Sequence, residues 1–423
     1  MLKVGHVVVR PGRKAGMDPV EIPVPEELET VPGIPMVSKD IDFYSREYPL
    51  VRQQVEHGAD TEWAPTVGTP AMQKYHHEHQ AVMEEFYPLM NRTGDLAPTG
   101  TPSGEDVTQL IRDKAAEMGF LDVGFTAHDV RFVYEDRKGH VKYQNAICLA
   151  LEQDFEETQT APSMAAEHGH YGTYEIQAPM GLRMVDYILS LGYGAQLHGP
   201  SNHSAATIPM FVAAGLGQLG ANGQLLHPHA GARCRLQIIT TDAPVTFDKP
   251  IDYGFHAFCQ VCQVCVNRCP GRALMREKIW WRGVEKNKLI YKRCRPVMSR
   301  YEGCAICMKV CPINKYGAKA VMEHYVETGQ VLGKGTHDLE GYTLEGKGYF
   351  GPGELPVFEA NFFSTMPHGT EYEHTFESFK AQAKAQGGIS DDLLEQFKAE
   401  MSTHLGQETT DQLQMMDQDA DYI

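Results

Sequence analysis

The sequence predicts a protein of mixed α/β (α+β) class, in which a small cysteine-rich domain follows a larger domain of alternating helices and strands. The first observation is that helical and strand patterns take turns across residues 102–250. The second is that eight of the ten cysteines fall between Cys259 and Cys311. At 423 residues with 42% hydrophobic composition, the chain is long enough for two or three packed domains.

The larger domain is predicted from its periodicity. Residues 107–118 repeat apolar side chains at helical spacing after a capping pattern at Ser103 and Asp106. Residues 121–127 alternate as a strand, and 145–152 form a continuously apolar strand. The elements that follow are a helix over 180–191, an extended stretch over 194–197, a helix over 208–214 and a strand over 235–241.

Four segments are expected along the chain. Residues 1–101 would form an extension that wraps the core, 102–250 the α/β domain, 251–325 the cysteine-rich domain, and 326–423 a segment covering the functional site. In the extension, residues 70–86 carry a helical pattern whose His76, His77 and His79 are interpreted as a solvated face. In the last segment, residues 316–334 begin as a helix, 375–386 and 391–404 are helical, and the acidic tail is partly disordered.

The cysteines are spaced as in proteins that hold iron–sulfur cubanes. The first run reads C-x2-C-x2-C-x3-C-P from Cys259 to Pro270, which is the bacterial ferredoxin pattern for a [4Fe–4S] cluster. The second run, Cys304-x2-Cys307-x3-C-P, has Cys294 ten residues upstream of its first cysteine. In this pattern a tight loop supplies three thiolates to one cubane, and the cysteine before the proline reaches the neighbouring one.

Two [4Fe–4S] clusters are therefore predicted. The first would be held by Cys259, Cys262, Cys265 and Cys311, and the second by Cys269, Cys294, Cys304 and Cys307. Cys294 departs most from the strict repeat. The alternatives are zinc, which favours paired C-x2-C arms, and disulfides, which need an oxidising compartment.

The distribution of charge along the chain indicates which kinds of partner the protein could bind. A net charge of −17 argues against nucleic acid. Residues 268–320 are nevertheless basic, with fourteen Lys or Arg against three acids. This excess either compensates the negative clusters or forms a dock for a separate acidic electron donor, such as ferredoxin or flavodoxin. No apolar run approaches the roughly 18 residues of a membrane span, and no export leader is visible, so a cytoplasmic protein without membrane contact is expected.

A glycine-rich loop, AGLGQLGANGQLLHP, lies between the predicted helix at 208–214 and the strand at 235–241. Its glycines would let the main chain approach a large ligand closely. The letters GLGQLG match G-x-G-x-x-G, but the segment follows a helix and precedes a turn, which is the wrong context for a dinucleotide site.

The order of motifs resembles the corrinoid (cobalamin)-dependent reductive dehalogenases, in their cytoplasmic, non-exported branch. The motifs are LSLGY at 189–193, the glycine loop, GARCR, TTDAP, KPIDYGF and the two cysteine runs, and they cover roughly residues 105–320. The resemblance implies a nitroreductase-like domain that binds base-off cobalamin beside one cubane, and a ferredoxin-like domain with both clusters. No reductase module follows residue 330, so the electrons would come from a separate protein.

The implied reaction is reductive cleavage of a carbon–halogen bond in a small organic compound. Electrons would pass through the clusters to Co(I), and a tyrosine would give the proton. We assign this tyrosine to Tyr174, with Tyr171 as the alternative, and its cationic partner to Arg233, with Arg235 as the competitor. A phenol with a pKa near 10 is protonated at neutral pH, and an adjacent guanidinium favours the phenolate left after transfer.

The remaining assignments concern the walls of the site. The residues assigned to cobalamin binding are Gly215, Gly217, Gly220, Gly223, Leu225, His227 and Asn202. His227 and His229 would touch the corrin tail rather than cobalt, and His198 and Asn202 would line the pocket. Candidate aromatic wall residues are Trp280, Trp281, Phe362 and Phe363.

Two other functions remain open. A related cobalamin and iron–sulfur reductase could act on epoxyqueuosine in tRNA or on a methyl group, although the acidic tail without helical repeats disfavours tRNA. A pure electron carrier would use the same cysteines, but it would not need the α/β domain ahead of them.

Overall fold

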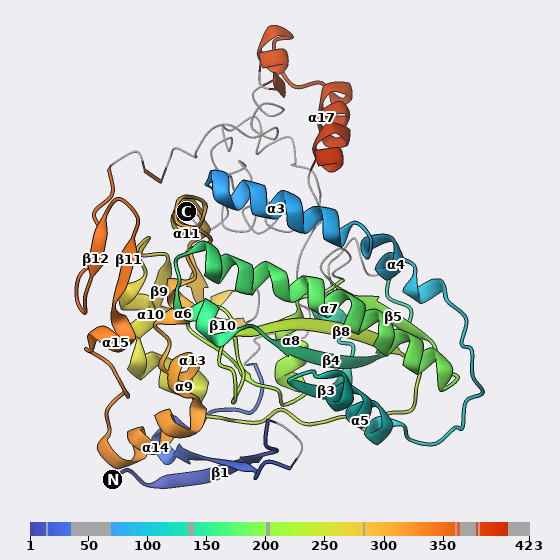
Figure 1. Cartoon of the computed structure of the whole chain (residues 1–423), viewed down its shortest axis with the longest axis horizontal. Coiled ribbons are helices and arrows are strands. Elements are labelled where there is room, and N and C mark those ends of the chain that lie inside the picture. The colour runs from blue at the N-terminus through green and yellow to red at the C-terminus, as the bar shows by residue number, and fades with distance from the viewer. Residues whose placement is uncertain are drawn as a thin grey trace.

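A four-stranded sheet forms the centre of the structure, a computed structural model shown in Figure 1. In spatial order its strands are β3 (Asp122–Ala127), β4 (Asn145–Glu152), β8 (Cys234–Thr241) and β5 (Ala195–His198). All neighbouring strands run antiparallel, so the predicted α/β (α+β) class is α+β. The structure describes residues 1–13, 16–34, 69–133, 139–199, 204–281, 284–359, 362–363, 378–379 and 381–404.

Helices cover both faces of this sheet because side chains alternate along each strand. On one face, α5 (Thr108–Met118) and α7 (Met164–Ser190) share a core with Ile239. On the other face, α8 (Thr207–Ala213) shares a second core with Ile238. The sheet is therefore buried on both sides, as the continuously apolar strand β4 predicts.

Helix α7 is longer than predicted, because it begins at Met164 and not near residue 180. Ser163 caps its start through a side-chain hydrogen bond with a backbone N–H of the first turn. Gly169 and Pro179 have low helix propensity, so the sequence pattern did not predict the first half of the helix. As a result, Tyr174 lies on a helix beside β8 and not on a loop.

The other predicted elements appear with small shifts at their ends. The 70–86 pattern gives α3 (Pro70–Met83), the 316–334 pattern gives α14 (Ala318–Thr328), and the 391–404 pattern gives α17 (Asp391–His404). Part of the predicted 375–386 helix and the acidic tail beyond residue 404 lie outside the described residues.

The N-terminal extension contacts two different parts of the molecule. A hairpin of β1 (Val4–Arg10) and β2 (Val20–Pro25) packs against α14 and shares a core with the cysteine-rich domain. Helix α3 lies along α7, followed by α4 (Tyr87–Asn91), as Figure 1 shows. An ion pair between Arg10 and Asp122 ties the hairpin to the central sheet.

The cysteine-rich domain is made of short helices around one hairpin. Its elements are α9 (Phe255–Cys262), α10 (Val264–Arg268), β9 (Leu274–Trp281), β10 (Val284–Leu289), α11 (Tyr291–Arg300), α12 (Ile306–Lys309) and α13 (Pro312–Tyr316). After α14 the chain returns over this domain as α15 (His337–Glu340), β11 (Tyr342–Leu344) and β12 (Gly348–Phe350).

Arg268 bonds the segment of α15, β11 and β12 to the cysteine-rich domain. Its side chain is 1% exposed, and it donates hydrogen bonds to the carbonyls of Glu340, Phe350 and Glu354. A buried guanidinium is retained where its donors are satisfied in this way. The basic excess of the domain is thus partly internal.

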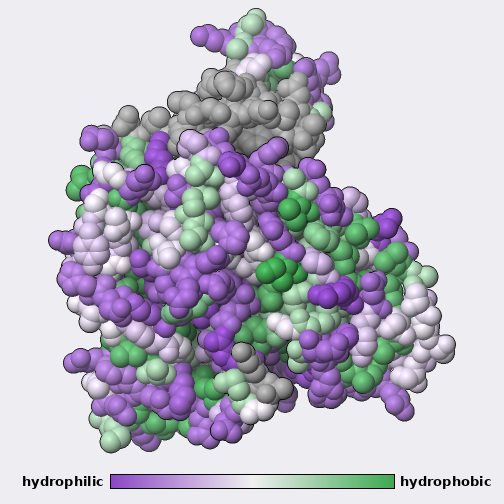
Figure 2. Space-filling model, viewed as in Figure 1, coloured by the Kyte–Doolittle hydropathy of each residue, from purple (hydrophilic) through white to green (hydrophobic). Residues whose placement is uncertain are grey.

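The surface is mixed in character. Figure 2 shows hydrophilic residues over much of one face, with apolar residues in scattered groups between them. Among the helices that the structure describes, none has both the length and the apolar character that a membrane crossing requires.

Candidate functional site

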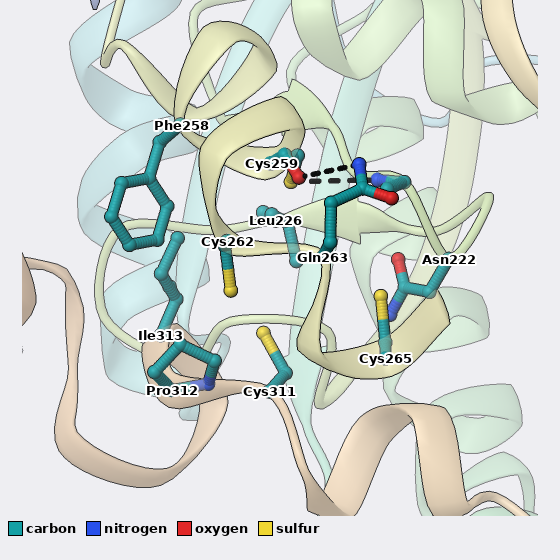
Figure 3. A pocket seen from close by; sticks show the side chains of 11 residues that line it. Asn222, Leu226, Phe258, Cys259, Cys262, Gln263, Cys265, Cys311, Pro312 and Ile313 are labelled. Carbon is teal, nitrogen blue, oxygen red and sulfur yellow. Dashed lines mark hydrogen bonds between the residues drawn. The ribbon is translucent and has the colours of Figure 1, made fainter. Parts of the chain in front are cut away.

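Four of the predicted ligands line one cavity. Cys259, Cys262 and Cys265 come from α9 and α10, and Cys311 precedes α13. Figure 3 shows the sulfur atoms of Cys262, Cys265 and Cys311 turned toward a common space. Burial raises the pKa of each of these thiols, that of Cys311 to about 12. Thiols that would stay protonated in water-free surroundings ionise readily when a metal takes up their charge, so this donor set fits a cluster.

The other four cysteines form a neighbouring group. Burial raises the pKa of Cys304 and of Cys307, and in both cases the nearby Cys294 and Cys269 thiols raise it further. Cys294, which departs most from the repeat, therefore lies with the expected partners. Cys307 also interacts with Cys311, so the two groups are close together, and the assignment of four ligands to each cluster remains a proposal. Within the described ranges, no three His, Cys, Asp or Glu side chains converge on a single metal ion.

The glycine loop faces the first cysteine group. It forms a hairpin of β6 (Gln218–Leu219) and β7 (Leu225–Leu226), and the Ala221 backbone N–H donates to Cys259 Sγ at 3.5 Å. Ala221 and Asn222 both line the cavity (Figure 3).

Three glycines of this loop lie close to other atoms of the chain, where a side chain would not fit. A Cβ on Gly217 would lie 2.3 Å from the Leu226 carbonyl oxygen, and one on Gly215, whose φ is +70°, would lie 2.5 Å from the Lys249 carbonyl oxygen. Gly220 is similarly close to Leu226 and Asn222. At these three positions the missing side chain already allows contacts within the chain, and the role of the glycines toward a large ligand stays a prediction. Gly223, with a φ of +76°, has open space where a Cβ would be.

His227 is buried and bonded within the chain. Its side chain is 0% exposed, its Nδ1 accepts from the His229 backbone N–H, and its Nε2 lies 3.1 Å from an Asp122 carboxylate oxygen. Both ring nitrogens are engaged, so the assignment of His227 to the corrin tail is corrected. His229 Nε2 contacts the Pro11 carbonyl. Leu225 lies in the core beside α8.

The predicted wall residues are scattered. His198 is buried on the α8 side of the sheet, where its ring nitrogens contact the Ser204 and Thr240 hydroxyls. Phe362 stacks on Phe358 beside the cysteine-rich domain, and Phe363 meets Phe358 edge-on. Asn202 and the side chains of Trp280 and Trp281 lie outside the described residues.

The cation beside Tyr174 is Arg235. Its guanidinium carbon lies 4.3 Å from the centre of the Tyr174 ring, and its Nε donates to the His170 carbonyl. Arg233 pairs instead with Glu152 at 2.6 Å, donates to the Gln153 carbonyl, and stacks on Phe155. The expected pairing of Tyr174 with Arg233 is corrected. Arg233 and Arg235 lie on the same face of β8, and it is Arg235 that reaches Tyr174 on α7.

A second set of polar residues surrounds Tyr174, and sequence reasoning missed it. His79 on α3 is buried and bonds with Glu175, and His76 bonds with Glu167 at 2.7 Å. Only His77 has the exposed position that was expected for all three histidines. The helical period places His76, His79 and Met83 on one side of α3, which was the available signal.

Glu167 is the most strongly perturbed carboxyl of this set. Burial raises its pKa, but hydrogen bonds with His170 and His76 outweigh this and bring the pKa to about 2. A Cβ on Gly303 would touch the Glu167 carboxylate. The first turns of α7 therefore contact the loop that carries Cys304.

Several buried polar atoms near α7 and β8 have no hydrogen-bond partner within the described part of the chain. They include His170 Nε2, Arg233 Nε, Gln153 Oε1 and both amide atoms of Gln177 and Gln237. Buried amides are normally satisfied by protein, water or ligand. A ligand with amide and carbonyl groups that reached these atoms would supply the missing partners.

The comparisons identify relatives of the central part of the chain. A tetrachloroethene reductive dehalogenase of Dehalobacter restrictus is 32% identical over 188 residues, 41% of this chain and 34% of that protein. One from Sulfurospirillum multivorans is 30% identical over 41% of this chain and 36% of that protein. An epoxyqueuosine reductase of Escherichia coli is 30% identical over 28% of this chain and 32% of that protein. The chain thus spans about a third of the length of these relatives, and no family model matches it.

Solved structures show the same fold. The catabolic reductive dehalogenase NpRdhA, in complex with 3-bromo-4-hydroxybenzoic acid, superposes with a TM-score of 0.59 at 23% identity, over 71% of this chain and 46% of that one. A reductive dehalogenase structure that suggests a mechanism for B12-dependent dehalogenation gives 0.54 at 22% identity, over 69% and 48%. The resemblance to the reductive dehalogenases is therefore confirmed over the matched segment, whereas the cytoplasmic branch stays a prediction.

Proposed function

We propose that the protein is a cobalamin-dependent iron–sulfur reductase that removes a halogen from a small organic compound. The overall change is R–X plus two electrons and one proton to give R–H and a halide ion. The observation that carries the proposal is the cavity lined by four cysteine thiols, one of which accepts a hydrogen bond from the glycine loop. A second group of four cysteines lies beside it.

The cofactors follow from these donor sets and from the family. Each group of four cysteines would hold one [4Fe–4S] cluster, because each cubane needs four thiolates. When bound in its base-off form, the cobalamin supplies the cobalt centre at which electrons from the clusters cleave the carbon–halogen bond. The unpaired amides of Gln177 and Gln237 would hydrogen-bond to its periphery.

The proton would come from Tyr174, with Tyr171 as the alternative donor. The phenol is neutral at pH 7 and can act as an acid. The Arg235 guanidinium on its ring stabilises the phenolate that remains after transfer. Arg235 is itself fixed by the His170 carbonyl, so its charge stays in place during transfer.

A separate acidic protein would deliver the electrons. Of the basic residues in 268–320, Arg268 and Arg295 are buried and suit the compensation of cluster charge. Arg272 and Arg276 are exposed and suit a docking surface. Reversing the charge of Arg276 and of half-buried Lys286 should slow reduction by an acidic ferredoxin at low salt and have little effect at high salt. An unchanged rate at low salt would mean that the basic residues only compensate cluster charge and do not form a docking surface. We extend the proposal to a cytoplasmic enzyme without nucleic-acid or membrane partners.

A second candidate is the reduction of epoxyqueuosine in tRNA, supported by the 30% identical segment of the Escherichia coli reductase. The net charge of −17 disfavours a polyanionic substrate. The choice is decided by assaying the reconstituted, reduced protein with tetrachloroethene, with 3-bromo-4-hydroxybenzoic acid and with epoxyqueuosine-containing tRNA. Release of chloride or bromide supports the proposal. Reduction of the tRNA base without halide release would replace it.

A further inference from the structure

A buried histidine faces the proposed proton donors from a neighbouring helix. Helix α3 lies along α7 (Figure 1), and His79 of α3 packs against Tyr171 and Tyr174. The centre of the His79 ring is 5.0 Å from that of Tyr171, which it meets edge-on, and 6.4 Å from that of Tyr174. The His79 side chain is only 4% exposed. A buried imidazole beside two phenols is suited to exchange protons with them.

Glu175 fixes the orientation of this imidazole. Its Oε1 lies 2.8 Å from His79 Nδ1, which leaves Nε2 on the opposite edge of the ring. The Glu175 side chain is 31% exposed, so the pair connects the buried ring with solvent. A carboxylate on one nitrogen of a histidine sets the role of the other nitrogen.

Burial is the largest influence on the pKa of His79, and charged neighbours act on it in both directions. Burial lowers its pKa, Glu175 raises it, and the nearby His76 and Arg235 lower it. A neutral imidazole has one donor and one acceptor nitrogen, and it can take up a proton on one side while releasing one on the other. Tyr75, also on α3, is the other ionisable ring within contact.

We propose that His79, held by Glu175, is the relay residue that returns a proton to the donor tyrosine after each turnover. This rests on the proposed function, since it requires a tyrosine that loses its proton to the substrate carbon. In that step the C–X bond breaks, two electrons from the external donor enter through the clusters, and the phenolic proton forms the new C–H bond. The phenolate then takes the Nε2 proton of the protonated His79 ring, while the Nδ1–H stays hydrogen-bonded to the Glu175 carboxylate, and the neutral ring regains a proton from solvent.

The relay separates the first turnover from the later ones. In the reconstituted full chain, pre-reduced and mixed with substrate, His79→Gln should leave the first turnover at the wild-type rate, because the tyrosine already carries its proton. The steady-state rate should fall roughly tenfold or more. Imidazole in the buffer should restore part of the steady-state rate of His79→Gly. His77→Gln, on the exposed side of the same helix, is the matched control and should keep both rates.

An equal loss in both phases would show that His79 only supports the fold of the site. No loss in either phase would overturn the relay outright.

A readout that does not depend on turnover is the coupling between the rings. In the full, cofactor-loaded chain in its oxidised, diamagnetic form, NMR signals of Tyr171 and Tyr174 should move as His79 titrates. Glu175→Gln should lower the pKa of His79. Tyrosine signals that ignore the His79 titration would overturn the relay. A wild-type protein that shows the coupling but releases no halide would count against the proposed function and not against the proton path.

Discussion

The guanidinium of Arg235 lies 4.3 Å from the centre of the Tyr174 ring, across the interface between strand β8 and helix α7. The contact joins a residue of the sheet to a residue of the long helix, and the backbone on both sides is regular. A cation at this distance stabilises negative charge that develops on the phenol. Arg235 therefore has a role beside the tyrosine, whereas Arg233, two residues earlier, pairs with Glu152.

Arg235 is expected to affect turnover, and Arg233 the fold. Arg235→Gln should reduce steady-state halide release by about tenfold or more, and Arg235→Lys should retain part of the rate, because the positive charge remains. Thermal unfolding of both Arg235 variants should stay close to that of the wild type.

Arg233→Gln is the comparison variant. It leaves the half-buried Glu152 carboxylate with Arg13 as its remaining cationic partner, and the loss of one charged hydrogen bond costs about 2 kcal/mol. Its melting temperature should therefore fall. If Arg233→Gln lowered turnover without loss of stability, and Arg235→Gln did neither, the assignment of the cation would be wrong.

The ligand sets predict which cysteine variants lose the same cluster. Cys262→Ser and Cys311→Ser should each lower the iron content from about eight to about four atoms per chain and leave the same EPR signal. Cys269→Ser and Cys304→Ser should leave the other signal. Cys148→Ala, buried in β4 and far from both runs in sequence, is the control and should keep all the iron.

A different grouping would contradict the crossed assignment. This would be the result if Cys311→Ser and Cys304→Ser lost the same cluster, as expected when each run of cysteines holds its own cubane.

Arg268 is expected to hold the segment that returns over the cysteine-rich domain. Arg268→Met leaves the Glu340, Phe350 and Glu354 carbonyls without their donor, at a cost of about 3 kcal/mol. The urea midpoint should fall, and limited proteolysis should cut near residues 335–358 earlier than in the wild type. Arg276→Met, exposed on β9, should change stability by less than about 0.5 kcal/mol. Equal stability of the two variants would refute the anchoring role.

The lowered pKa of Glu167 predicts that the folded protein loses stability in acid. Its folded-state pKa of about 2 lies below the ordinary value of 4.5, so the ionised carboxylate stabilises the folded state above pH 4.5. This contribution, on the order of 3 kcal/mol, should be lost as the pH falls from 4.5 to 2. Glu167→Gln should be less stable at pH 7 and should show a smaller loss over that window. Parallel stability curves for the two proteins between pH 7 and pH 2 would contradict this.

Local patterns predicted most of the elements of the central domain. The strand over 145–152 and the helix before Gly119 were found because burial leaves a clear periodic signal and Gly119 ends the helix. The predicted cap at Ser103 and Asp106 was wrong, because Val107 precedes the helix and makes no side-chain cap. The first half of α7 was missed, because Gly169 and Pro179 dilute that signal although tertiary packing keeps the helix intact.

Spacing alone predicts a cysteine cluster, whereas it could not predict the surroundings of the tyrosine. The choice between Arg233 and Arg235 depends on how β8 is rotated against α7. The bond between His79 and Glu175 joins residues 96 positions apart. No local pattern carries either relationship, because both arise from the packing of whole elements.

The measurement that tests the central claim most directly is the metal content of the reconstituted chain, with its absorption and EPR spectra. The account predicts about one cobalt and about eight irons per chain, with a corrin absorption band and signals from two interacting [4Fe–4S] clusters. Eight irons without any bound cobalt, under conditions that load a known reductive dehalogenase, would contradict it and leave an electron carrier.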